Sequence, residues 1–467
     1  MRHIRSIAAC LCTLLATQAS ADSFVPDPGF GVNGVATHEW PASYGYQYNA
    51  ANVWMAVQNS GKLVVATQLR NGTSETLWMN WFEPSGQPTT PGPGGGPYAP
   101  SSYFSQGAGL VTHWDGSIGL LGTHTIDSGD SDFRLYRAFP NGEPGYQGCA
   151  GGFLQDVAFD VGPPGQRQDI PRTLVLDGEG RSYVVGNANA GGGQSVLAIA
   201  RIGRYCGLET IYGSNGRVTT AIGPSRTVRP HVAILDAQDR LLVGGGITTD
   251  TGSNPPGRCF VSRFTNAGRL DGGFAGTGTH QISNFTSYSG TFSCKVTGLA
   301  TDSSGRIYVQ GRWTVKNGAD EKRNRFHLRL NPNGSGDSAY NDIALVTGGL
   351  DGNLDIEAAD LAVFEADGYV ARLGSNITYA GDGSARGFIT GNRLDTGISS
   401  DGPFTRAGVP GASVAYHRIV KIDDDTFYVL ATSGPDYMTH HKTHVIRYRR
   451  DSMLPPSDRI FFDAFES

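Results

Sequence analysis

A unit of about sixty residues recurs along this chain and limits what the chain can fold into. Each copy has an apolar stretch, a polar turn that ends in Gly or Asp, and a second stretch rich in β-branched and aromatic residues. The clearest copies span residues 175–186 and 299–311. The turn residues fall at positions 61, 116, 180, 239, 305, 368 and 425, so neighbouring copies are 55 to 66 residues apart. This regularity predicts seven structural repeats.

Each repeat has the pattern of two β-hairpins. Asp or Asn opens the first turn, where its side chain accepts backbone hydrogen bonds, and Gly at the end supplies positive φ. Alternation on either side, as in residues 307–309, is typical of a pleated strand. A second hairpin follows, for example at residues 263–268, and then a Phe-x-x-x-Gly or Tyr-Gly-x-x-Gly motif, for example at residues 274–278. Four strands per unit is the content of a β-propeller blade.

The two ends of the chain indicate how the repeats close. A fourth-strand motif stands alone at residues 30–35, whereas the last unit, residues 418–450, has three strands. The sequence therefore predicts an all-β fold, a single closed β-propeller of seven four-stranded blades in which the N-terminal strand completes the last blade and removes exposed edges. An open array of blades and two smaller propellers are the alternatives.

These motifs resemble the delta-60 repeat family. Its pattern runs Leu-Asp-x-x-Phe-Gly-x-x-Gly-x-Val, then Asp-Gly-Lys-Ile-x-Val-x-Gly, then Arg-Tyr-x-x-x-Gly. Residues 271–274, 305–311 and 263–264 match it closely, and the resemblance covers nearly all of residues 27–450, with blades one, two and six degenerate. The motif is structural, so the resemblance implies a fold and hardly any function.

The N-terminus indicates export. Arg2 and Arg5, a short apolar run and a small-x-small site at residues 19–21 predict a signal peptide over residues 1–21, a propeller over 22–456 and a short tail over 457–467, in a secreted or periplasmic protein. No later segment is long and apolar enough for a membrane span. Removing the two arginines changes the net charge from -5 to -7. That charge argues against nucleic acid as a partner, because nucleic-acid binding needs clustered Lys and Arg.

Four cysteines remain in the mature chain. An even count in an oxidising compartment favours disulfides, and four cysteines allow three pairings. Cys149–Cys206 and Cys259–Cys294 are the favoured pairs because each spans neighbouring repeats.

The long loops of one propeller face are the expected binding surface, because function usually lies on loops over a rigid scaffold. The first of them is aromatic, which suits stacking on a sugar or peptide, although packing between blades is the alternative. Oxygen-bearing residues at 351–357 are a candidate calcium loop, but Ile356 and Ala362 stand where a helix–loop–helix calcium site needs Gly and an acid. The candidate ligand-binding residues are Trp40, Tyr44, Tyr46 and Tyr48, and the candidate metal ligands are Asp351, Asn353, Asp355 and Glu357.

Two further polar clusters could hold a metal ion. His440, His441 and His444 precede the final strand, and an exposed polar loop is the alternative interpretation. Asp127, Asp130 and Asp132 form a similar acidic segment. Beyond calcium, the sequence predicts no cofactor.

The chain carries no contiguous catalytic motif. The leading hypothesis is a monomeric, non-catalytic binding or scaffold propeller whose partner is an extracellular glycan or protein. The alternative is a hydrolase, lyase or quinone-type oxidoreductase that uses the central funnel. This alternative requires charged side chains from three or more blades to meet at the axis.

Overall fold

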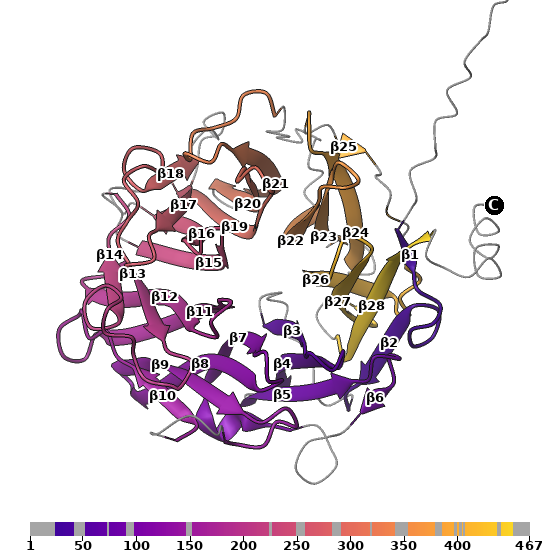
Figure 1. The fold of residues 1–467 in the computed structure, drawn as a ribbon, viewed down its shortest axis with the longest axis horizontal. Coiled ribbons are helices and arrows are strands. Elements are labelled where there is room, and N and C mark those ends of the chain that lie inside the picture. Colours follow the sequence, from indigo (N-terminus) through magenta and orange to yellow (C-terminus); the bar gives the residue numbers. More distant parts are fainter. Residues whose placement is uncertain are drawn as a thin grey trace, which may run out of the picture.

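The chain folds into antiparallel strands arranged around a central axis (Figure 1). The computed structural model describes residues 24–41, 52–71, 74–89, 98–145, 152–223, 227–248, 257–282, 291–317, 320–340, 354–378, 385–396, 399–400, 404, 407–436 and 440–451. Within these residues the helical content is one short 3-10 turn, η1 (Pro100–Tyr103), and no helix is long and apolar enough to cross a membrane. The predicted all-β class is therefore confirmed.

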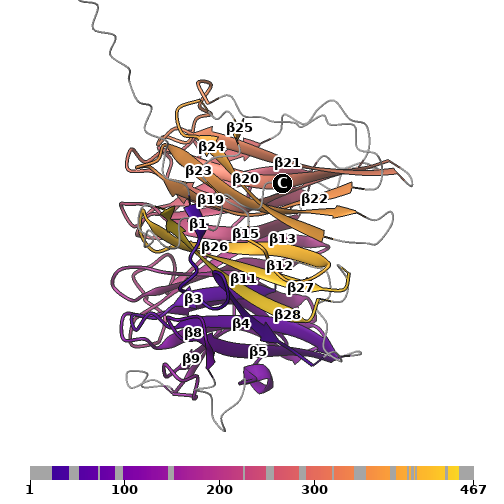
Figure 2. The same ribbon diagram turned by 90° about the vertical axis from the view of Figure 1, so that its right-hand side faces the viewer.

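The strands pair mainly in an antiparallel manner, and we group them along the chain into units that we call blades; two parallel pairings join blade 2 to blade 3 and blade 6 to blade 7 in larger sheets. Seen from the side, their strands run across the thickness of the molecule (Figure 2). Blade 1 holds β3 (Val53–Val57), β4 (Leu63–Asn71), β5 (Ser74–Phe82) and β6 (Pro88–Thr89). Blade 2 holds β7 (Gln106–Thr112), β8 (Ile118–Asp127), β9 (Asp130–Ala138) and β10 (Leu154–Val157). Blade 3 holds β11 (Arg167–Leu176), β12 (Ser182–Gly191), β13 (Gln194–Ile202) and β14 (Arg217–Thr220).

The remaining blades follow the same order. Blade 4 holds β15 (Thr227–Leu235), β16 (Leu241–Thr248), β17 (Arg258–Phe264) and β18 (Thr279–Ile282). Blade 5 holds β19 (Thr291–Thr301), β20 (Ile307–Asn317) and β21 (Asp320–Leu330). Blade 6 holds β22 (Leu354–Phe364), β23 (Tyr369–Thr378), β24 (Ala385–Arg393) and β25 (Ser399–Ser400). Blade 7 holds β26 (Ser413–Lys421), β27 (Thr426–Gly434) and β28 (Lys442–Arg450), together with β1 (Phe24–Pro26) and β2 (Val35–Glu39) from the N-terminus.

The N-terminal segment joins the last blade, as the sequence predicts. Phe24 of β1 aligns with Arg450, and Val35 of β2 aligns with Ile446, both on β28. The motif at residues 30–35 differs from the prediction in one respect, because it forms a turn between the two strands and not a strand. The Gly34 amide donates a hydrogen bond to the Phe30 carbonyl at 3.0 Å and closes this turn. The innermost strands contact one another in the order β3, β7, β11, β15, β19, β22 and β26, and β26 in turn contacts β3.

The predicted turn residues adopt the predicted backbone conformation. Six of the seven have positive φ, namely Gly61, Gly116, Gly180, Asp239, Gly305 and Gly368. In the first turn of blade 5 the carboxylate of Asp302 accepts a hydrogen bond from the Arg306 amide at 2.9 Å. The same pattern recurs at Asp177 in blade 3 and Asp236 in blade 4.

A buried arginine links one blade to the next at the outer side of the third strand. Arg263 in blade 4 lies 4.7 Å from the centre of the Phe274 ring, and its Nε atom donates to Asp271 at 2.8 Å. Its Nη1 atom donates to the Pro332 carbonyl of blade 5 at 2.5 Å. Three further arginines make the same contacts: Arg201 pairs with Glu209, packs on the ring of Tyr212 and donates to the Asn266 carbonyl. Arg329 pairs with Asp337, packs on the ring of Tyr340 and donates to the Leu394 carbonyl. Arg447 pairs with Asp27, packs on the ring of Phe30 and donates to the Pro84 carbonyl. We call Arg201, Arg263, Arg329 and Arg447 the interblade arginines.

The interblade arginines explain the Asp-x-x-Phe and Arg-Tyr elements of the repeat. The acid neutralises the guanidinium, the aromatic ring packs on its face, and the remaining donors reach the neighbouring blade. Arg447 makes the connection from blade 7 to blade 1, across 363 residues of sequence.

A disulfide adds a covalent link between blades. Cys259 on β17 is bonded to Cys294 on β19, as predicted, with a sequence separation of 35 residues. Cys206 is also disulfide-bonded, and its predicted partner Cys149 lies outside the described residues.

Candidate functional site

The predicted aromatic binding residues are only partly within the described chain. Tyr44, Tyr46 and Tyr48 lie outside it. Trp40 is 4% exposed and packs in an apolar cluster with Val53 and Leu69. Its indole nitrogen donates to Thr443 at 3.0 Å. The ring is thus part of the core, so its position agrees with the packing interpretation and gives no support to stacking on a ligand.

The predicted metal ligands are not brought together by the described structure. Asp351 and Asn353 lie outside the described residues, and Asp355 and Glu357 belong to β22 with side chains that are not described. Within the described residues, no three His, Cys, Asp or Glu side chains are arranged to hold a metal ion.

The histidine cluster is buried, which corrects the interpretation as an exposed loop. His440 is 2% and His444 0% exposed. His440 contacts the hydroxyls of Ser413 and Thr432 at 2.9 and 2.8 Å. Since both ring nitrogens of His440 are hydrogen-bonded to hydroxyls, this imidazole is held as a polar element of the blade 7 core.

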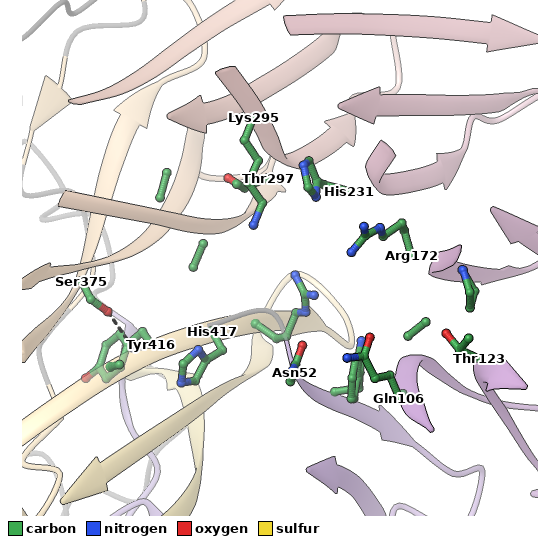
Figure 3. A pocket seen from close by; sticks show the side chains of 18 residues that line it. Asn52, Gln106, Thr123, Arg172, His231, Lys295, Thr297, Ser375, Tyr416 and His417 are labelled. Atoms are coloured by element: carbon green, nitrogen blue, oxygen red, sulfur yellow. Dashed lines mark hydrogen bonds between the residues drawn. The ribbon is translucent and has the colours of Figure 1, made fainter. Parts of the chain in front are cut away.

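A cavity of about 110 Å³ lies on the central axis, and every blade contributes to its lining. Side chains of Lys295, His231 and Arg172 extend toward it from three neighbouring blades (Figure 3). Charged residues of blades 3, 5 and 7 therefore meet at the axis, which is the condition that the funnel alternative requires. The polar and aromatic lining residues are Asn52, Trp54, Gln106, Thr123, Arg172, His231, Lys295, Thr297, Ser375, Tyr416, His417 and Arg418. We call Arg172, Lys295 and Arg418 the axial cations.

β-Bulges direct several of these side chains to the axis. The register of β11 shifts between Pro171 and Thr173, so that Arg172 is the extra residue. A bulge places an additional residue opposite one partner residue and re-aims its side chain. Equivalent shifts in β7, β15, β19, β22 and β26 surround Ala108, His231, Thr297, Ala359 with Asp360, and His417.

The sequence analysis missed these residues, although a positional signal for them exists. Each bulge residue precedes the turn residue of its own repeat by eight positions, as Arg172 precedes Gly180 and His231 precedes Asp239. Aligning the repeats on the turn would have shown that this position carries polar residues in blades 3 to 7. Single sites sixty residues apart give no contiguous motif, so motif searching could not find them.

The electrostatics of the cavity are dominated by positive charge. Burial, reinforced by Arg312, Arg418 and Arg172, lowers the pKa of Lys295 to about 7. Burial, reinforced by the cations Lys295, Arg172, Arg312 and Arg229, lowers the pKa of His231 well below its usual value, so this imidazole is neutral. No carboxylate in the described part of the chain lies within ion-pair distance of Lys295 or Arg172.

One carboxylate lies beside the cavity. Asp360 on β22 accepts hydrogen bonds from the amides of Leu361 at 3.0 Å and Ile419 at 3.2 Å. Burial raises the pKa of Asp360 to about 6, and Arg418 opposes that rise. Asp360 therefore offsets part of the charge of Arg418, which leaves the side of the cavity formed by Arg172 and Lys295 uncompensated.

His417 connects the cavity to the buried histidine network. Its Nε2 atom is 2.8 Å from the Thr432 hydroxyl, which in turn is 2.8 Å from His440. This chain of hydrogen bonds fixes the orientation of the His417 ring at the cavity wall.

Comparisons with known proteins support the fold. No family model and no curated protein matches this chain. The polysaccharide lyase Uly1 is structurally similar, with a TM-score of 0.50 and 10% identity over 92% of this chain and 97% of the lyase. A protein of unknown function from Dyadobacter fermentans aligns with a TM-score of 0.42 and 10% identity over 89% of this chain and all of that chain. At these identities the similarity concerns the fold alone, and the chain has a β-propeller-type fold.

Proposed function

We propose that this protein is an exported, single closed propeller of seven delta-60-like blades that binds an anionic ligand in its central cavity. The axial cations carry this proposal: three cationic side chains from three blades line one cavity, and the described chain supplies only Asp360 as a nearby counter-charge. Partly buried cations with so little counter-charge are costly for folding, which favours a role in which a ligand supplies the missing negative charge. Closure of the ring is supported by the contact of β26 with β3 and by the Arg447 link to blade 1.

A carboxylate is the anion that suits the cavity best. Arg172 offers a planar donor pair that matches a carboxylate, and Lys295 offers a single charged donor. Acidic extracellular glycans carry such groups, and a glycan is one of the two partner classes, glycan or protein, that the sequence analysis leaves open. The site lies at the axis and not at the aromatic loop around Trp40.

The number of carboxylates at the cavity helps to distinguish a binding module from a glycoside hydrolase. Glycoside hydrolysis ordinarily needs two carboxylates on opposite sides of the scissile bond. The described residues at the axis offer one, Asp360, which is held by two backbone amides. Binding of an acidic ligand is therefore better supported than hydrolysis by paired carboxylates.

Calorimetric titration with trigalacturonate and with neutral galactotriose tests the proposal. We expect binding of the acidic trisaccharide only, weakened by salt. Arg172→Gln should reduce its affinity at least about tenfold, because a charged hydrogen bond contributes about 1.5–3 kcal/mol. Arg393→Gln, which alters an exposed arginine paired with Asp395, is the matched control and should leave the affinity unchanged. Equal affinity for both sugars, or an unchanged affinity in Arg172→Gln, would overturn the proposal.

A further inference from the structure

Lys295 differs from every other lysine whose side chain the structure describes. Lys62, Lys421 and Lys442 pair with Glu83, Asp424 and Glu39 at 2.8, 2.5 and 3.2 Å. Lys295, in contrast, has no carboxylate of the described chain within ion-pair distance and extends into the central cavity (Figure 3). Within the described chain, Lys295 therefore has no ion-pair partner.

The groups around Lys295 favour its uncharged form. Arg312 is its cross-strand neighbour on β20, Arg172 approaches from β11, and Arg418 approaches from β26. His231 on β15 also faces this group and is neutral. Together with burial, these cations bring the pKa of Lys295 to about 7, so that a large fraction of the side chain is a free amine near neutral pH. A free amine is a nucleophile, and desolvation beside other cations is an established way to activate lysine.

The neighbouring arginines define which electrophile the amine can meet. Arg172 and Arg418 line the same cavity and can hold a carboxylate. A ligand that carries both a carboxylate and a carbonyl group can therefore be anchored by its charge while its carbonyl carbon meets Lys295. Two sources share this chemistry: a small keto acid and the open-chain reducing end of a uronic acid.

We propose that Lys295 is a nucleophile that forms an imine with the carbonyl carbon of a carboxylate-bearing ligand in the central cavity. This inference rests on the proposed anion site and adds covalent chemistry to it. The lone pair of Nζ forms a bond to the carbonyl carbon, the π electrons of the C=O bond move to oxygen, and a proton passes from the nitrogen to that oxygen to give the carbinolamine. The hydroxyl group then takes up a second proton and leaves as water while the nitrogen lone pair forms the C=N bond, and loss of the remaining N–H proton gives the neutral imine.

Reductive trapping tests the inference on the full mature protein. Pyruvate and galacturonate, each with cyanoborohydride at pH 7, should add to Lys295 at least about tenfold more than to Lys62, as measured by peptide mass spectrometry. Lys295→Arg and Lys295→Met should abolish that adduct, and Lys62→Arg should leave it unchanged. Labelling by pyruvate but not galacturonate assigns the small keto acid as the source, and the reverse assigns the uronate end. Equal labelling of Lys295 and Lys62 by both probes would overturn the inference.

Ligands without a free carbonyl separate this inference from the proposed function. Lactate and methyl galacturonide carry the carboxylate alone, so they should protect Lys295 from trapping without forming an adduct. If methyl galacturonide binds in a titration but neither carbonyl probe labels Lys295, the anion site stands and the imine chemistry is wrong. If neither binding nor labelling occurs, both proposals fail.

Discussion

The interblade arginines and the axial cations are similar side chains in opposite surroundings. Arg263 is nearly inaccessible, yet a carboxylate, an aromatic ring and a carbonyl of the next blade satisfy its guanidinium. Lys295 is half-buried, faces other cations and has no carboxylate partner in the described chain. The first environment favours the charge and stabilises the fold, whereas the second opposes the charge, as expected of a side chain whose charge a ligand would neutralise. The presence of a partner, more than burial, therefore distinguishes the interblade arginines from the axial cations.

The largest expected loss of stability comes from substitution of an interblade arginine. Arg263→Ala removes a buried guanidinium and leaves Asp271 with only the more distant Arg240, at 3.6 Å, as an ion-pair partner, which should lower the free energy of unfolding by about 3–5 kcal/mol. Denaturant unfolding measures this loss. A loss of unfolding free energy no larger than that of the surface substitution Arg393→Ala would show that the interblade arginines do not hold the blades together.

Asp169 is a buried negative charge that, like the axial cations, has few groups to stabilise its charged form. Asp169 on β11 is 0% exposed and its Oδ1 atom has no hydrogen-bond partner among the described residues. Burial raises the pKa of Asp169 to about 7. The nearby charge of Asp132 adds to this rise, and the hydrogen bond from the Phe159 amide opposes it. The unfolded chain therefore loses this proton near pH 4 and the folded chain near pH 7, so this group lowers stability as the pH rises between these values. Asp169→Asn should stabilise the protein at pH 8 by about 2–3 kcal/mol. The stability gained by Asp169→Asn should vanish at pH 3. Thermal unfolding of both proteins between pH 3 and pH 8 measures this change, and a gain that does not depend on pH would contradict the prediction.

Substitution at the axis should have the opposite sign to substitution at the outer side. Since the folded pKa of Lys295 is lowered, the folded state binds fewer protons than the unfolded state between about pH 7 and pH 10.5, and stability rises with pH across that window. Lys295→Met should raise the free energy of unfolding at pH 6 by about 1–2 kcal/mol, after allowance for partial exposure. The gain should shrink toward pH 10. A loss of stability at pH 6 would place Lys295 among the structural residues.

The smallest effect is expected at an exposed pair. Arg393 and Asp395 are bonded at 3.0 Å on the surface, where solvent screens the charges. Arg393→Ala should leave the thermal midpoint nearly unchanged and should not alter anion binding. A shift comparable to that of Arg263→Ala would remove the distinction between satisfied buried arginines and surface arginines.

The sequence predicts the repeat geometry well because local chemistry determines it. Positive φ at Gly61 and Gly305 follows from the turn pattern. The pairing of the N-terminal segment with β28 follows from the motif at residues 30–35, although that motif forms the turn between the two pairing strands and not a strand itself. The role of the Asp-x-x-Phe element was not predicted, because Asp271 acts through Arg263 on a carbonyl 69 residues away from that arginine.

The site could not be predicted in the same way. Arg172 belongs to no contiguous motif, and the register shift between Pro171 and Thr173 that makes it the extra residue of β11 is a property of the folded sheet. Trp40 is a second example: an aromatic residue in a long loop suits either stacking on a ligand or packing between blades, and this ring completes the core beside blade 1. The positions of Arg172 and Trp40 both depend on packing between repeats that are distant in sequence, and the sequence of a single repeat does not show that packing.

A crystal structure of the protein grown with trigalacturonate would test the central claim most directly. We predict a carboxylate of the sugar in the central cavity, in contact with Arg172 and with Lys295 or Arg418. Ordered sugar bound at another surface, with no anion in the cavity, would contradict the account.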